Sequence, residues 1–111
     1  MTTVYVIENP KGALYVGLTE DVAHRLESHN NGGCVTTSKI GGPWTLKHQW
    51  DGLDYISASK LERLLHRQKA ERLREFIVKY PTADHFVISV LATMKTTPYE
   101  LRRNSELGYA H

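Results

Sequence analysis

Two short stretches near the start of the chain, residues 3–7 and 13–18, are rich in β-branched and aromatic side chains. Such stretches are typical of β-strands. Between them, residues 9–12 read Asn-Pro-Lys-Gly, which is favourable turn chemistry. The pattern therefore predicts an antiparallel hairpin.

The register of this hairpin decides where two tyrosines lie. We expect a pairing of Tyr5 with Tyr15, which places both on one face together with Gly17 and requires an odd number of loop residues, such as residues 8–12. The other face is then aliphatic, with Val4, Val6, Leu14, Val16 and Leu18. Because both faces are largely apolar, we expect both to be covered.

A first helix of about three turns is expected between Thr19, a suitable N-cap, and the Asn-Asn-Gly-Gly stop at residues 30–33. Its buried stripe is Val22 and Leu26. Arg25 and His29, four residues apart, share one edge of that stripe. The local pattern also fits an exposed arginine and a histidine favoured by the helix dipole.

Residues 34–43 form a polar, glycine-containing connection, and the alternation in residues 44–50 predicts a third strand. It puts Trp44, His48 and Trp50 on one face, where core packing is the favoured interpretation over base stacking or metal binding.

Residues 57–79 have helical periodicity, with a drift at residues 68–70 that allows either a kink or two helices. Glu62 lies on the flank of the apolar stripe. Ser59-x-x-Glu62 also fits a capping box, in which the glutamate would only stabilise the helix start. Further on, residues 85–92 predict a fourth strand, and Thr97-Pro98 opens a final helix.

The composition adds limits. With 111 residues, 41% of them hydrophobic and 23% charged, the chain should form one globular domain. No apolar run is long enough to span a membrane, and the N-terminus does not resemble a signal peptide, so we expect no membrane partner and a cytoplasmic protein. Cys34 is the only cysteine, which excludes an internal disulfide and a zinc ribbon; we expect an inert thiol.

Positive charge is concentrated in one segment, although the net charge is only +2. Residues 57–80 carry seven Lys or Arg and three Asp or Glu. A solvated helix face and a strip facing phosphates both explain this band.

Five short motifs, in order and at consistent spacing across residues 3–79, resemble one family. They are Val4-Tyr5-Val6, Tyr15-Val16-Gly17, Thr19-x-Asp21-Val22-x-x-Arg25-Leu26-x-x-His29-Asn30-x-Gly32, Gly42-Pro43-Trp44 and Ala58-x-x-x-Glu62. Together they resemble the GIY-YIG nuclease superfamily, and most closely its small stand-alone members.

The resemblance implies an α/β (α+β) fold with a small central antiparallel three-stranded sheet flanked by helices. The resemblance covers residues 3–79, which would be the core of the single domain 1–111. Residues 80–111, with the extra strand and helix predicted above, would be a C-terminal extension. It also implies a metal-dependent endonuclease that hydrolyses DNA phosphodiester bonds, with one divalent cation, Mg²⁺ or Mn²⁺, held by Glu62.

Carried over by position, the family implies specific roles. Tyr5 resembles the general base, Tyr15 a partner that orients water or phosphate, and Arg25 the phosphate clamp. His29 would assist proton transfer or orient a tyrosine, and Gly17 would be structural. A tyrosine base must lower its pKa by about 3 units to ionise near neutrality, which a metal and Arg25 would favour.

Where the family has a lysine about one turn after Glu62, this chain has His66. Lys39, Arg67 and Lys69 are the cations we expect on the DNA backbone. Two alternatives remain: a catalytically inactive nucleic-acid-binding module of the same fold, and a protein-interaction module. We expect a monomer or weak homodimer that could rely on a DNA-reading partner.

Overall fold

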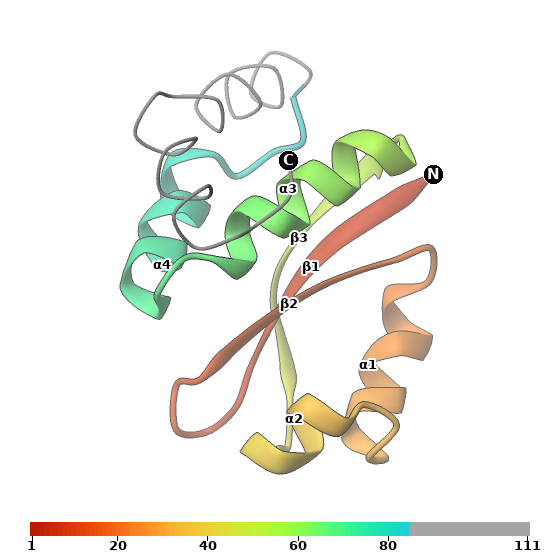
Figure 1. Cartoon of the computed structure of the whole chain (residues 1–111), viewed down its shortest axis with the longest axis vertical. Coiled ribbons are helices and arrows are strands. Elements are labelled where there is room, and N and C mark those ends of the chain that lie inside the picture. The colour runs from red at the N-terminus through yellow and green to blue at the C-terminus, as the bar shows by residue number, and fades with distance from the viewer. Residues whose placement is uncertain (85–111) are drawn as a thin grey trace, which may run out of the picture.

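The computed structural model describes residues 1–84. It contains three strands and four helices (Figure 1): β1 (Thr2–Glu8), β2 (Leu14–Thr19), α1 (Val22–Asn30), α2 (Val35–Ile40), β3 (Thr45–Leu53), α3 (Tyr55–His66) and α4 (Ala70–Lys79). The strand predicted at residues 85–92 and the helix predicted at Thr97-Pro98 lie outside the described residues. Within residues 1–84, no helix is long and apolar enough to cross a membrane.

The sheet is antiparallel throughout and has the order β2-β1-β3, so β1 is its central strand. Helices α3 and α4 lie on one side of the sheet, and α1 and α2 on the other (Figure 1). This arrangement confirms the predicted α+β class with a three-stranded antiparallel sheet flanked by helices.

Each face of the sheet has its own core, as the alternating apolar residues of the hairpin predicted. One core joins the sheet to α3 and α4 through Val4, Val6, Val16, Trp50, Leu53, Ala58, Leu61, Leu65 and Leu73. The smaller core, on the side of α1 and α2, consists of Tyr5, Ile7 and Trp44, with Ala13, Tyr15, Val22 and Leu26 packed against it. Val22 and Leu26, predicted as the buried stripe of the first helix, face this core but are only partly buried.

The hairpin register differs from the predicted one by two residues. Tyr5 is opposite Gly17, and Tyr15 is opposite Ile7, so the pairing of Tyr5 with Tyr15 was wrong. A shift of two keeps every side chain on its face, and the two tyrosines still share one. The loop holds five residues, 9–13, and Asn9 closes it by accepting from the backbone N–H groups of Lys11 and Ala13 at 3.0 and 2.8 Å.

The third strand contains an irregularity that the alternation did not reveal. Val6 pairs with His48, but Ile7 pairs with Leu46, so one extra residue of β3 is accommodated there. A bulge of this kind reverses the faces of the residues beyond it. Trp44 and Trp50 therefore pack on opposite sides of the sheet, and the prediction of a shared face was wrong. His48 packs against Trp50, with ring centroids 4.6 Å apart.

Two helices begin elsewhere than predicted. Asp21, not Thr19, caps α1, and its carboxylate accepts from the backbone N–H of His24 at 3.1 Å. Asp54 caps α3 by accepting from the backbone N–H of Ser57 at 2.7 Å. Glu62 consequently lies well inside α3, which rules out the capping-box interpretation.

The predicted helical stretch of residues 57–79 consists of two helices, α3 and α4, rather than one kinked helix. The connection at residues 34–43 is not only a loop, because it contains the six-residue α2. That helix is too short and too polar to show an apolar stripe.

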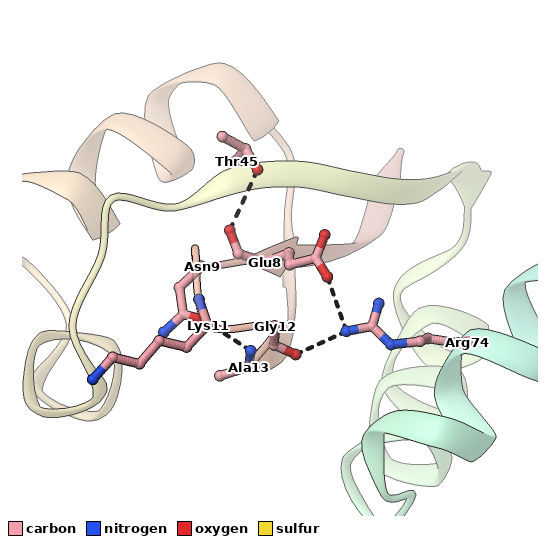
Figure 2. Close-up of polar contacts among 7 residues, drawn as sticks. All are labelled: Glu8, Asn9, Lys11, Gly12, Ala13, Thr45 and Arg74. Carbon is pink, nitrogen blue, oxygen red and sulfur yellow. Dashed lines mark hydrogen bonds and ion pairs between the residues drawn. The ribbon is translucent and has the colours of Figure 1, made fainter.

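A single arginine fixes the hairpin loop to α4 (Figure 2). Arg74 forms an ion pair with Glu8 at 2.9 Å, and its Nη2 donates to the carbonyl oxygen of Gly12 at 2.8 Å. The two contacts lie at the two ends of the turn. They therefore hold the hairpin of β1 and β2, which carries Tyr5 and Tyr15, against α4.

Candidate active site

The side chain of Tyr5 lies over Gly17 of the neighbouring strand β2. Tyr5 is only 1% exposed and pairs with Gly17 on β2. A Cβ atom on Gly17 would lie 2.9 Å from Cε1 of Tyr5 and still nearer to Cζ and the hydroxyl. The absence of a side chain at Gly17 therefore leaves the space that the phenol of Tyr5 occupies.

We expect Gly17→Ala to displace this phenol. Overpacking of a tight site costs about 1–3 kcal/mol, which thermal or urea unfolding would measure. A displaced catalytic group should lower cleavage by about 10²-fold. In a Tyr5→Val background the alanine should be nearly neutral for stability, because the ring that it contacts is gone. Equal destabilisation in both backgrounds would contradict this explanation.

The hydroxyl of Tyr5 is held by two residues of α1. It lies 2.7 Å from Nε2 of His29, and Nε of Arg25 donates to it at 3.4 Å. The four-residue spacing of Arg25 and His29 places both on the helix edge that faces the hydroxyl. This is the shared edge that the sequence predicted.

Thr37, on α2, holds the other side of the imidazole. Its hydroxyl lies 2.8 Å from Nδ1 of His29 and donates to the carbonyl oxygen of Cys34 at 3.4 Å. In the tautomer in which Thr37 accepts from Nδ1–H, Nε2 of His29 carries no hydrogen and can accept the proton of Tyr5.

Thr37 is fully buried, with 0% of its surface exposed, and is the site residue that the sequence interpretation missed. It lies eight residues after His29, on the helix that was read as a loop. The only signal that could have found it is the need of a buried histidine for a second partner.

The protonation states follow from burial. Burial, and then the charge of Arg25, lowers the pKa of His29, so the imidazole is neutral at pH 7. Burial also raises the pKa of Tyr5, and the hydrogen bond and charge of Arg25 oppose this rise without cancelling it. Arg25 alone therefore does not produce the ionised tyrosine that a simple base would require.

Tyr15 forms the more accessible side of the site. Its ring packs edge-on against His29 at 5.2 Å and against His66 at 5.6 Å between centroids. Cys34 Sγ donates to its hydroxyl at 3.9 Å. Burial, followed by the charge of Cys34, raises the pKa of Tyr15 to about 12. Tyr15 is thus a neutral hydrogen-bonding group on the edge strand β2.

Glu62 and His66 reach this edge from α3, on the other side of the sheet. Their side chains are 27% and 42% exposed, and Glu62 Oε2 lies 3.4 Å from His66 Nε2. His66 contacts Tyr15 directly, and the charge of Glu62 contributes a small upward shift to the pKa of Tyr5. The five catalytic candidates, Tyr5, Tyr15, Arg25, His29 and Glu62, therefore belong to one neighbourhood.

The described residues contain no group of three or more His, Cys, Asp or Glu side chains that could hold a metal ion. A cation held by Glu62 would thus have one protein carboxylate. That is an acceptable donor set for Mg²⁺ or Mn²⁺, which commonly keep several waters and bind substrate phosphates.

The three cations expected on the nucleic-acid backbone are all exposed. Arg67 and Lys69 follow His66 in the connection between α3 and α4, so they lie at the Glu62 end of the site. Lys39 lies in the last turn of α2, the helix that carries Thr37.

An α+β domain with tyrosines, an arginine and a histidine on one side of an edge strand and a glutamate on the other is the arrangement that the resemblance to a nuclease family implied. The comparisons name the family. Residues 1–75 match the model described as the GIY-YIG catalytic domain, and the chain belongs to the GIY-YIG family, as its motifs suggested.

Similar proteins carry names that describe no activity. The UPF0213 protein SG0387 of Sodalis glossinidius is 31% identical over 98 residues, which cover 86% of this chain and 92% of that protein. A UPF0213 protein of Yersinia pestis strain Pestoides F is 34% identical over 73 residues, or 63% of this chain and 77% of its own. No solved structure matches the chain significantly. The family is one of nucleases that generally use divalent metal ions, so a nucleic acid is the implied substrate.

Proposed function

We propose that this protein is a metal-dependent endonuclease that hydrolyses phosphodiester bonds in DNA, with the attacking water activated at Tyr5. The observation that carries the proposal is the hydrogen-bonded row of Tyr5, His29 and Thr37 beside Arg25. In this proposal Tyr5 is the base, His29 accepts its proton and Thr37 orients His29. Arg25 is a cation suited to binding phosphate.

The hydrogen-bonded row of Tyr5, His29 and Thr37 allows Tyr5 to accept a proton from water although its pKa is raised. As a water molecule gives a proton to the phenol oxygen, the phenol gives its own proton to Nε2 of His29. The resulting hydroxide attacks phosphorus, and the bond to the leaving oxygen breaks with its electron pair on that oxygen, which then takes a proton from solvent water. Tyr5 stays neutral throughout, and the positive charge that forms resides on His29. Thr37 acts as a positioning residue by keeping Nδ1 protonated, which leaves Nε2 free for this transfer.

Two further side chains would act on the phosphate. Arg25 donates to its non-bridging oxygens, where charge grows in the transition state. Tyr15, neutral and less buried than Tyr5, orients the phosphate or the water. Lys39, Arg67 and Lys69 would contact neighbouring phosphates and give binding that weakens with salt.

Glu62 would hold one divalent cation, Mg²⁺ or Mn²⁺, at the edge of β2. When bound, such a cation neutralises charge on the phosphate and leaving oxygen. The incomplete protein shell leaves coordination positions for substrate.

Metal removal tests the activity. We expect the purified chain to nick supercoiled plasmid in Mg²⁺ or Mn²⁺ and to lose cleavage completely in EDTA, with recovery when the metal is returned. Gel-shift assays in EDTA should still detect DNA binding that is strongest at low salt, because phosphate contacts are weakened by counterions. Cleavage that persists in EDTA would contradict the proposal.

The burial of Tyr5 supports a second candidate, a nucleic-acid-binding module that has lost turnover. At 1% exposure, Tyr5 has little surface available to a water molecule. This candidate predicts DNA binding without cleavage in any divalent metal, over any pH range.

A further inference from the structure

We propose that His66 is a second protein ligand of the cation at Glu62, and that the site consequently prefers Mn²⁺ or another first-row transition-metal ion to Mg²⁺. This inference rests on the proposed function, because it concerns the same cation. It assigns a role to a residue that the nuclease proposal leaves unused.

The geometry of the pair carries the inference. Glu62 and His66 are one turn apart on α3, and Oε2 and Nε2 are separated by 3.4 Å. That is longer than the 2.7–3.2 Å of an ordinary N–H···O hydrogen bond. Two atoms bound to one ion at about 2.1 Å lie about 3.0 Å apart at octahedral angles and about 3.4 Å apart at tetrahedral angles. The observed 3.4 Å matches the tetrahedral spacing, and a small rotation of either partly exposed side chain gives the octahedral one.

Access and orientation agree with this role. Both side chains are partly exposed, at 27% for Glu62 and 42% for His66, so an ion can reach them. Tyr15 packs edge-on against the His66 ring at an interplanar angle of 85°. This contact limits rotation of the imidazole.

The donor set determines the metal. Mg²⁺ prefers oxygen ligands, whereas an imidazole nitrogen favours transition-metal ions, whose affinities increase from manganese toward nickel. A charged lysine at position 66 could not serve as this ligand, whereas a neutral imidazole can.

The test is metal binding by the whole chain without DNA. Mn²⁺ binding is followed by the loss of the free-ion electron paramagnetic resonance signal, and Ni²⁺ binding by calorimetry. We expect His66→Ala and the better-matched His66→Gln each to raise the Mn²⁺ and Ni²⁺ dissociation constants by at least about tenfold. The Mg²⁺ constant, obtained by competition, should change by less than about twofold, because Mg²⁺ gains little from nitrogen.

Two controls separate the possible outcomes. His24→Ala removes an exposed histidine of α1 and should change no constant; if it weakens binding as much as His66→Ala, the ions bind the surface unspecifically and the inference is wrong. If Glu62→Gln weakens Mn²⁺ binding and the His66 variants do not, this inference fails and the proposed function stands. If neither position affects binding, the cation is not on α3 and both proposals fail.

Discussion

Glu62→Gln is expected to reduce DNA cleavage in Mg²⁺ or Mn²⁺ by at least about 10³-fold. In our proposal Glu62 is the only carboxylate at the cation, and metal stabilisation of transition-state charge supplies several kcal/mol. About 4 kcal/mol corresponds to a factor of 10³ in rate. Glutamine keeps the size of the side chain but binds a divalent cation far more weakly than a carboxylate does.

The fold should tolerate this change. Glu62 lies inside α3, where glutamine has nearly the same helix propensity as glutamate. Its contact with His66 is partly exposed, and such pairs contribute about 0–1 kcal/mol. We expect the melting temperature to move by no more than a few degrees.

The measurement is single-turnover cleavage at saturating protein, with circular dichroism and DNA binding recorded on the same preparations. Glu71→Gln is the matched control, because Glu71 is exposed in the first turn of α4. A Glu62→Gln protein that cleaves within about fivefold of wild type would exclude Glu62 from the role of metal ligand, since even one uncompensated kcal/mol gives that factor.

Much of this site could be predicted from the sequence, because it depends on the alternation of side chains along strands and on the spacing of residues along a helix. Strand side chains alternate, so Tyr5 and Tyr15 share a face in any register that differs by an even number of residues. This is why an incorrect pairing still gave the correct face. Arg25 and His29 were similarly placed together by a four-residue spacing that depends little on the exact start of α1.

The features that failed depend on long-range contacts. The bulge in β3 arises from its pairing with β1, and the alternation within residues 44–50 carries no sign of it. Thr37 belongs to a short helix without an apolar stripe, and it joins the site only because His29 is buried and needs a partner. The cap of α3 was misplaced because a capping box and Asp54 are both plausible helix starts.

Tyr5→Phe is expected to lower the cleavage rate by about 10²–10⁴-fold, the usual contribution of a general base. The substitution removes only the hydroxyl, so the ring still fills the space over Gly17. It also leaves Nε2 of His29 buried without a hydrogen-bond donor, which should cost about 1–3 kcal/mol of stability. The rate must therefore be measured below the melting transition of the variant.

The pH dependence distinguishes the proton relay from a tyrosinate base. In the relay, His29 must be neutral to accept the proton of Tyr5. Its pKa is lowered from 6.5, so the wild-type rate should be level above pH 6.5 and fall below it, as His29 becomes protonated. A base that has to ionise alone would give a rate that still rises toward pH 10.0 and beyond, because burial raises the pKa of Tyr5 above that value.

The acid limb should disappear in Tyr5→Phe, because the remaining slow reaction no longer passes a proton to His29. Tyr55→Phe, at a tyrosine 65% exposed on α3, is the control and should keep both the wild-type rate and its pH profile. If Tyr5→Phe retains the wild-type rate with the acid limb intact, water is activated elsewhere. Tyr15, the less buried tyrosine of the site, would then be the next candidate to test.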